Sequence, residues 1–279
     1  MSGIWKIRQI FDGDYGCEER VRPRLSVTLH DASGNQCIRS VTEQWLAQRG
    51  LIEGSEWPEY SHIFFDLDGT LTKSEFGVID SVIYALRRMG IEEENRESLK
   101  RFIGPPLFES FREFYQMSEA DADRAVAYYR EIYEAEGIYQ SPLYEGVEEM
   151  LDALKKAGKH LVVVTSKPDK MAEKVLSSLK IRTYFDGVAA PGNQDRHSDK
   201  SVLIGKALQM CGLRDGSAAI MVGDRHFDID GAVTAGIDSI GVLYGYGSLD
   251  ELEGAGASFL AESPAGLVEL LRNSLLGVC

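Results

Sequence analysis

Residues 62–71 read His-Ile-Phe-Phe-Asp-Leu-Asp-Gly-Thr-Leu, an apolar run that ends in two aspartates and a glycine. The run His62–Phe65 predicts a buried strand, and Gly69 allows the backbone to turn sharply directly after it. In an open parallel sheet, ligands bind at the carboxyl ends of the strands, so we expect Asp66 and Asp68 at a reaction site. An Asp-Gly turn with solvated carboxylates is the alternative interpretation of the same residues.

Apolar runs and helical patterns alternate along the chain after residue 61. The apolar runs predict further strands at residues 161–164, 187–190, 218–222 and 239–243. Periodic apolar positions closed by a glycine predict helices at residues 146–157 and 199–211. Strands that alternate with helices are typical of an α/β fold with a doubly wound parallel sheet.

The segment between the first two predicted strands contains helical patterns throughout. Ser118 is placed to cap a helix that runs to Glu136, and an earlier helix has one apolar face made of Val78, Val82, Leu86 and Met89. We therefore expect an all-helical cap at residues 77–141. It is inserted into a core domain made of residues 59–76 and 142–279.

The first part of the chain has a different pattern. Period-two alternation at residues 5–10, 24–29 and 37–41 predicts short antiparallel strands, and residues 42–49 predict one short helix. Residues 1–58 are therefore expected to form a small β-rich module. Its sequence does not indicate a role.

A second acidic motif follows another predicted strand. Residues 220–228 read Ile-Met-Val-Gly-Asp-Arg-His-Phe-Asp, which places Asp224 at a strand end and Asp228 four residues later. Carboxylates that converge from neighbouring strand ends suit Mg²⁺, a hard cation that prefers oxygen ligands. The alternative role for Asp228 is that of a helix N-cap, which is compatible with support of a metal site.

Two further features predict a site for an anion. Thr165 and Ser166 end a strand just before Lys167-Pro168, where a helix is expected to begin with Pro168 in its first turn. A hydroxyl beside the free N–H groups of a helix start can hold an anion. Lys200 lies at the start of the next predicted helix, and a solvated surface lysine is the alternative interpretation.

Composition excludes several classes of protein. The chain has 279 residues with 44 Asp and Glu against 30 Lys and Arg, a formal net charge of −14. This charge repels polyphosphate backbones, so we expect no nucleic-acid partner. We also expect no membrane partner, because no stretch is long and apolar enough for a membrane helix and the first residues lack the apolar core of a secretory signal. A cytoplasmic location is the resulting expectation.

The four motifs, in this order, resemble those of the haloacid dehalogenase superfamily, specifically its phosphatases with a helical cap. The resemblance covers about residues 61–277 and implies a Rossmann-like core. It implies that Asp66 is the nucleophile and that Asp68 is the general acid and base. It also implies phosphate binding by Thr165, Ser166 and Lys200, and Mg²⁺ ligation by Asp66, Asp68 through its backbone carbonyl, Asp224 and Asp228.

The predicted cap carries a segment that bears on the substrate. Residues 101–107, Arg-Phe-Ile-Gly-Pro-Pro-Leu, are similar to the phosphoglycolate phosphatase-like group and to members described as 5′-nucleotidases. Arg101, Gly104 and Arg112 are candidate substrate contacts in the cap. A stiff turn between helices at Gly104 and exposed arginines are the alternatives.

These observations predict a Mg²⁺-dependent phosphomonoester hydrolase that acts through an aspartyl-phosphate on small phosphorylated metabolites. Phosphoglycolate and nucleoside 5′-monophosphates are the expected substrates. One alternative is a phosphotransferase or phosphomutase on sugar phosphates, and another is a non-enzymatic binding protein that acts through residues 1–58. The oligomeric state stays open between a monomer and a homodimer.

Overall fold

The computed structural model describes residues 4–12 and 24–271. Its centre is a sheet of six parallel strands in the order β6-β5-β4-β7-β8-β9. In chain order the strands are β4 (His62–Phe65), β5 (His160–Val164), β6 (Gly187–Ala189), β7 (Ala219–Gly223), β8 (Asp238–Val242) and β9 (Phe259–Ala261). The predicted doubly wound α/β fold is confirmed. Strand β9 was not predicted from the sequence.

Helices cover both faces of this sheet because successive strand residues point to opposite sides. Phe65 packs in the cluster that includes helices α6 (Val147–Lys156), α7 (Asp169–Ser178) and α11 (Pro264–Leu271). Its neighbour Phe64 packs in a second cluster with α8 (Lys200–Met210) and α9 (His226–Ala235). Helix α10 (Leu249–Ala255) packs against α9. The strands are therefore buried on both faces, as their continuous apolar runs predicted.

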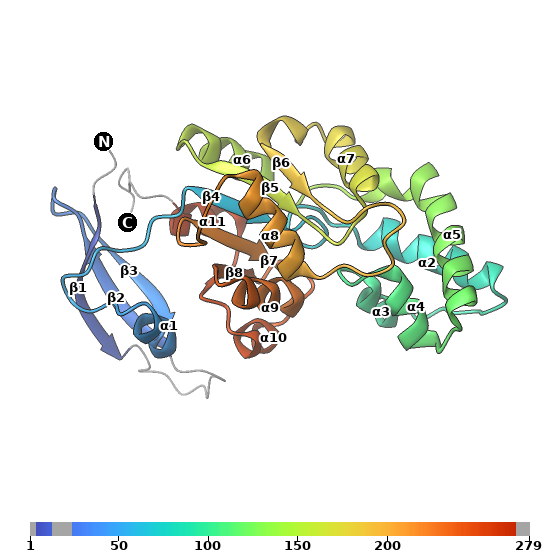
Figure 1. Cartoon of the computed structure of the whole chain (residues 1–279), viewed down its shortest axis with the longest axis horizontal. Coiled ribbons are helices and arrows are strands. Elements are labelled where there is room, and N and C mark those ends of the chain that lie inside the picture. The colour runs from blue at the N-terminus through green and yellow to red at the C-terminus, as the bar shows by residue number, and fades with distance from the viewer. Residues whose placement is uncertain (1–3, 13–23, 272–279) are drawn as a thin grey trace.

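The segment between β4 and β5 is helical, as predicted. It contains α2 (Glu75–Arg88), α3 (Arg96–Leu99), α4 (Leu107–Tyr115) and α5 (Glu119–Ala135). The Ser118 hydroxyl caps α5 by accepting a hydrogen bond from the backbone N–H of Asp121. We call α2 to α5 the cap helices. Figure 1 shows them at one end of the molecule, beyond the carboxyl ends of the strands.

The N-terminal strands form a separate antiparallel sheet at the opposite end of the molecule (Figure 1). It has the order β1-β2-β3 and consists of β1 (Lys6–Asp12), β2 (Arg24–His30) and β3 (Gln36–Thr42), followed by α1 (Glu43–Gln48). The alternation in this region therefore predicted its strands correctly. Parts of the predicted module and core, residues 1–3, 13–23 and 272–279, lie outside the described residues. The division into domains stays a prediction.

A buried aspartate joins this small sheet to the core. Asp238 begins β8, and its Oδ1 accepts a hydrogen bond of 2.8 Å from the Trp45 indole N–H of α1. Its other oxygen accepts a hydrogen bond from the Tyr60 hydroxyl and forms an ion pair with Arg49. Burial and the Asp238 carboxylate raise the pKa of Tyr60 well above its usual value. One carboxylate therefore satisfies polar groups from two separate segments, α1 with its C-cap residue Arg49 and the segment that contains Tyr60.

Replacing Asp238 with Ala is expected to lower the free energy of unfolding by about 3 kcal/mol, because the buried donors of Trp45 and Tyr60 would lose their acceptor. Thermal or urea unfolding followed by circular dichroism measures the change. The control is Asp152→Ala, which removes a surface ion pair with Lys156 and should cost under about 1 kcal/mol. A cost for Asp238→Ala no larger than that of the control would contradict this account of the junction.

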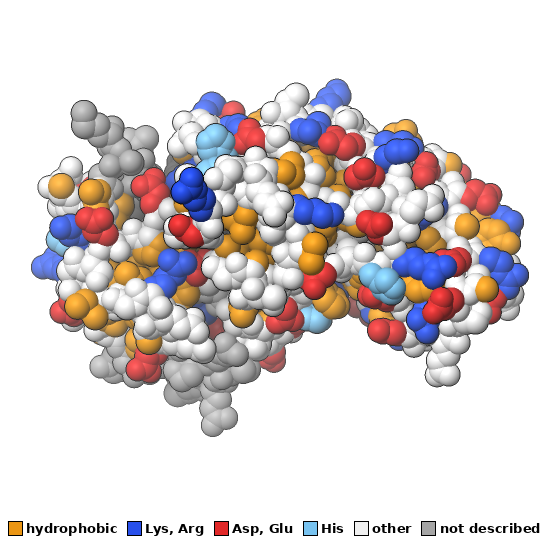
Figure 2. Space-filling model, in the orientation of Figure 1, with side chains coloured by type: hydrophobic (Ala, Val, Ile, Leu, Met, Phe, Trp, Pro, Cys, Tyr) orange, Lys and Arg blue, Asp and Glu red, His pale blue; other side chains and the backbone are white. Residues whose placement is uncertain are grey.

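Charged side chains of both signs are interspersed over the face of the molecule drawn in Figure 2. Among the described residues, no helix combines the length and apolar character needed to cross a membrane.

Candidate active site

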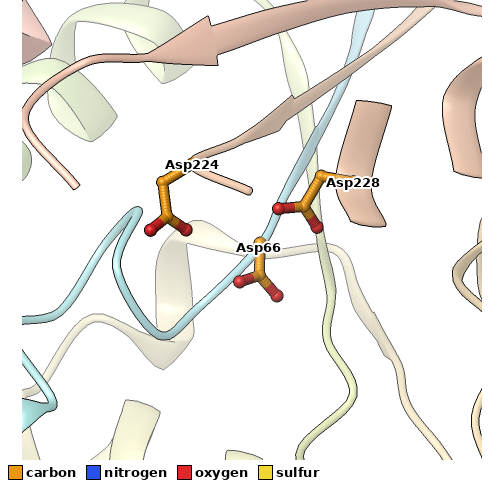
Figure 3. A group of neighbouring side chains, drawn as sticks. All are labelled: Asp66, Asp224 and Asp228. Atoms are coloured by element: carbon orange, nitrogen blue, oxygen red, sulfur yellow. The ribbon is translucent and has the colours of Figure 1, made fainter. Parts of the chain in front are cut away.

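Three buried aspartates meet at the carboxyl edge of the main sheet. Asp66 follows β4, Asp224 follows the adjacent β7, and Asp228 lies in the first turn of α9. One carboxylate oxygen from each lies within 4.8 Å of the others, and Figure 3 shows the three side chains around a common space. We call Asp66, Asp224 and Asp228 the aspartate cluster. The strand ends thus bring Asp66 next to two acids that lie more than 150 positions later in the sequence, as the predicted sheet requires.

Lys200 supplies positive charge to the aspartate cluster. Its ammonium lies 2.8 Å from Asp66 Oδ1 and 2.8 Å from Asp228 Oδ1, and it donates a further hydrogen bond of 3.1 Å to the Val164 carbonyl. Burial alone would lower the pKa of Lys200, but the carboxylates of Asp228 and Asp66 outweigh burial and raise it. Lys200 is therefore a buried cation of the site, and the surface alternative is wrong.

Glycines make room for these carboxylates. At Gly69, which has a φ of +92°, an added Cβ would lie 2.2 Å from Asp224 Oδ2. At Gly223 an added Cβ would lie 2.2 Å from Asp228 Cγ, and at Gly245 it would lie 2.3 Å from Asp224 Cβ. Any other residue at these positions would displace the acids. The close packing of the aspartate cluster therefore depends on glycine at all three.

The aspartate cluster carries more negative charge than Lys200 can balance. Burial raises the pKa of Asp66 to about 7, with Lys200 opposing the rise and Asp228 adding to it. Burial and the neighbouring carboxylates of Asp228 and Asp66 raise the pKa of Asp224 well above its usual value. Oxygen ligands that repel one another in a buried space suit a hard divalent cation. The residues present therefore fit Mg²⁺.

Asp68 lies beside the aspartate cluster but faces a different partner. Its Oδ2 is 2.9 Å from the ammonium of Lys167, which also donates a hydrogen bond of 2.8 Å to the Tyr133 hydroxyl of α5. The other oxygen, Oδ1, is buried and has no hydrogen-bond partner among the described residues. Sequence reasoning missed Lys167 and Tyr133, although the position of Lys167 directly after Thr165-Ser166 was a usable signal. Metal ligation through the Asp68 carbonyl stays a prediction.

The predicted phosphate-binding hydroxyls lie at the end of β5. Thr165 is buried, and its hydroxyl accepts a hydrogen bond of 3.2 Å from the backbone N–H of Lys167. Ser166 lines the cavity described below. Pro168 is the N-cap of α7 rather than a residue of its first turn, because the helix begins at Asp169. The hydroxyls and the helix start thus lie together, as the anion site requires.

A cavity of about 400 Å³ separates the cap helices from the core. Asp68, Ser166 and Lys167 form part of its wall, and apolar side chains such as Phe102 and Phe108 form another part. The predicted cap contact Gly104 also lines this cavity.

The two arginines predicted as cap contacts do not line this cavity. The guanidinium of Arg101 lies 4.3 Å from the centre of the Phe114 ring, within the cap. Arg112 forms an ion pair with Glu119 at 3.9 Å and borders a separate surface hollow. Aromatic and acidic neighbours on the cap thus hold both side chains away from Asp68.

Polar contacts that sequence reasoning missed hold the cap helices against the core. Arg196, in the loop after β6, pairs with Asp123 at 2.5 Å and with Glu119 at 3.2 Å. The Arg225 guanidinium donates a hydrogen bond of 3.2 Å to the Ile103 carbonyl. Of these two arginines, Arg196 also lines the cavity.

Comparison with known proteins places this site in a family. Residues 63–242 match the family model of haloacid dehalogenase-like hydrolases. A 5′-nucleotidase of Pseudomonas aeruginosa is 37% identical over 77% of this chain and 96% of its own length. The tyrosine-protein kinase PtkA of Mycobacterium tuberculosis is 32% identical over 76% of this chain and 72% of its own length.

Solved structures agree with these matches. The crystal structure of a "predicted phosphatase" from Clostridium acetobutylicum superposes with a TM-score of 0.74 at 39% identity, over 76% of this chain and 98% of that one. The resemblance seen in the sequence motifs is thus confirmed, and the chain belongs to the haloacid dehalogenase-like hydrolase family.

Proposed function

We propose that the protein is a Mg²⁺-dependent phosphomonoester hydrolase that forms a phosphoryl intermediate on Asp66. The observation that carries this proposal is the convergence of Asp66, Lys200 and two further carboxylates at the edge of the sheet. The motif order and the phosphatases among the relatives support it.

Asp66 acts as the nucleophile. The ammonium of Lys200 holds its Oδ1 at 2.8 Å, so Oδ2 is the oxygen that would attack phosphorus. The new bond joins Asp66 to phosphorus as the bond to the leaving oxygen breaks. Lys200, Thr165 and the N–H groups at the start of α7 offset the negative charge of the phosphoryl oxygens, which would otherwise repel a carboxylate.

Asp68 moves the protons of both half-reactions. In the first it gives a proton to the departing alkoxide, and in the second it takes one from the water that cleaves the bond between phosphorus and Asp66. Its side chain lines the cavity, where both the leaving group and the water must lie. Its Oδ1, which has no hydrogen-bond partner among the described residues, is the oxygen that would exchange the proton.

Asp66, Asp224 and Asp228 would hold the Mg²⁺ ion. When bound, the ion supplies charge neutralisation at the phosphoryl oxygens. The carboxylates of Asp224 and Asp228 serve to place it, and the ion pair between Asp228 and Lys200 fixes the lysine at the same time.

The cavity favours a small phosphomonoester that carries a second polar or anionic group. Arg130 of α5 lines the cavity, and no carboxylate of the described residues forms an ion pair with it. Phosphoglycolate would place its carboxylate near such a guanidinium, and a nucleoside 5′-monophosphate would place its base against the apolar wall of Phe102 and Phe108. The relative named 5′-nucleotidase supports the second of these substrates.

Phosphoryl transfer to an acceptor other than water is a second candidate function. A relative is named a tyrosine-protein kinase, and a phosphorylated Asp66 could pass its phosphoryl group to a hydroxyl as well as to water. Recovery of the phosphoryl group as inorganic phosphate distinguishes hydrolysis from transfer.

The metal provides the test of the proposed function. Phosphate release from phosphoglycolate, nucleoside 5′-monophosphates and 4-nitrophenyl phosphate should be lost in EDTA, by at least about 10²-fold, and should return with added Mg²⁺. A phosphodiester, which lacks the monoester dianion, serves as the negative control. Full activity in EDTA would contradict the metal assignment, and no phosphate release from any monoester would contradict the hydrolase.

A further inference from the structure

Lys167 joins the core to the cap at the carboxylate of Asp68. Its side chain is only 6% exposed, and its ammonium contacts Asp68 Oδ2 at 2.9 Å and the Tyr133 hydroxyl at 2.8 Å. We propose that Lys167 is a positioning residue that orients the Asp68 carboxylate toward the water that cleaves the phosphoryl intermediate. Its hydrogen bond to Tyr133 of α5 makes this orientation depend on the closed cap. The inference rests on the proposed function, because it assigns a role in the same reaction.

The contacts of Asp68 determine which of its oxygens can act as a base. Lys167 holds Oδ2, while Oδ1 is buried without a hydrogen-bond partner among the described residues. An ammonium donates hydrogen bonds and accepts none, so Lys167 cannot itself remove the proton of the water. It can fix the rotation of the carboxylate, which leaves Oδ1 as the oxygen that can accept a hydrogen bond from the water.

The second contact of Lys167 comes from the cap. Tyr133 lies on α5, its ring stacks on that of Tyr129 with centroids 5.2 Å apart, and the Lys167 ammonium lies 4.5 Å from the Tyr133 ring centre. Burial raises the pKa of Tyr133, so its hydroxyl stays neutral and accepts the lysine hydrogen bond. When the cap lifts, Lys167 loses this partner. Asp68 is therefore held in place as the base only while the cavity is closed. Water consequently does not cleave the phosphoryl intermediate while the cap is open.

Stopped-flow kinetics with 4-nitrophenyl phosphate separates the two half-reactions, since 4-nitrophenolate leaves without a proton. We expect Lys167→Met to keep the burst of nitrophenolate within about fivefold of the wild-type rate and to slow the following steady state by about 10²-fold, the usual size of a general-base effect. Lys167→Arg should restore part of the steady-state rate. In an Asp68→Asn background, Lys167→Met should cause no further slowing, because both residues act on one step.

Lys174→Met is the matched control, since Lys174 of α7 also joins the core to the cap, by an ion pair with Glu134 at 2.9 Å, and does not touch Asp68. It should leave both phases unchanged. Tyr133→Phe removes a single hydroxyl. It should slow the steady-state rate severalfold and leave the burst intact. This variant tests the coupling between the cap and Asp68 even where Lys167→Met fails to fold.

The inference would be overturned if Lys167→Met slowed the burst and the steady state equally. It would also be overturned if the losses of steady-state rate from Lys167→Met and Asp68→Asn were fully additive in the double variant. A steady-state rate of Tyr133→Phe equal to that of the wild type would overturn the coupling of Asp68 to the cap. Failure of the proposed function would look different, because the wild-type protein would then release no nitrophenolate in a reaction that depends on Asp66.

Discussion

Replacing Asp66 with Asn is expected to lower kcat for phosphomonoesters by at least about 10⁴-fold, the scale of losing a covalent nucleophile. The amide has nearly the same shape as the carboxylate but cannot attack phosphorus. The change should not destabilise the metal-free protein above pH 7. Burial raises the pKa of Asp66 to about 7, so above pH 7 folding has to bury an ionised carboxylate, which costs free energy. The neutral amide of Asn avoids this free-energy cost.

Phosphate release and thermal unfolding at pH 8 measure these two effects. The control is Asp230→Asn, an acid two residues beyond Asp228 whose side chain is exposed and pairs with His226 rather than with the cluster. It should retain activity within about twofold, because surface substitutions seldom reach a buried site. Activity of Asp66→Asn within tenfold of the wild type would show that the nucleophile lies elsewhere.

Replacing Asp68 with Asn should separate the half-reactions. Turnover of all phosphomonoesters should fall by about 10³-fold, because the amide cannot take a proton from water. A burst of nitrophenolate should nevertheless remain with 4-nitrophenyl phosphate, since that group leaves unprotonated and Asp66 is intact. An alkyl phosphate should give no burst, because its alkoxide needs the proton of Asp68.

Rapid mixing, with the burst amplitude compared with the enzyme concentration, measures this difference. Equal loss of the first turnover for the aryl and the alkyl substrate would contradict the proton role of Asp68. It would leave the nucleophilic role of Asp66 untouched.

The sequence predicted those parts of the molecule that local patterns determine. The apolar runs that end at Phe65, Val164 and Val222 form strands whose carboxyl ends meet, because parallel strands joined by helical crossovers leave few other arrangements. The convergence of Asp66, Asp224 and Asp228 followed from that topology. Lys200 lies beside Asp66 and Asp228, and its role in phosphate binding stays a prediction.

Other features depend on contacts between distant segments that no local spacing records. Asp68, Tyr133 and Lys167 come from three separate elements, and only the position of the cap on the core brings them together. Strand β9 is a short apolar stretch, Phe259–Ala261, which by itself does not distinguish a strand from a helix or a loop. The charge of Arg101 and Arg112 predicts contacts to an anion, but their aromatic and acidic neighbours in the cap decide where they lie.

The most direct test of the account is to identify the residue that carries the phosphoryl group. Asp68→Asn protein would be mixed with 4-nitrophenyl phosphate and Mg²⁺, quenched in acid and digested for mass spectrometry. The account predicts one phosphoryl group on the peptide that contains Asp66, removable by hydroxylamine and absent when Asp66 is also replaced by Asn. Phosphate release without a phosphorylated peptide, or a phosphoryl group on any other residue, would contradict it.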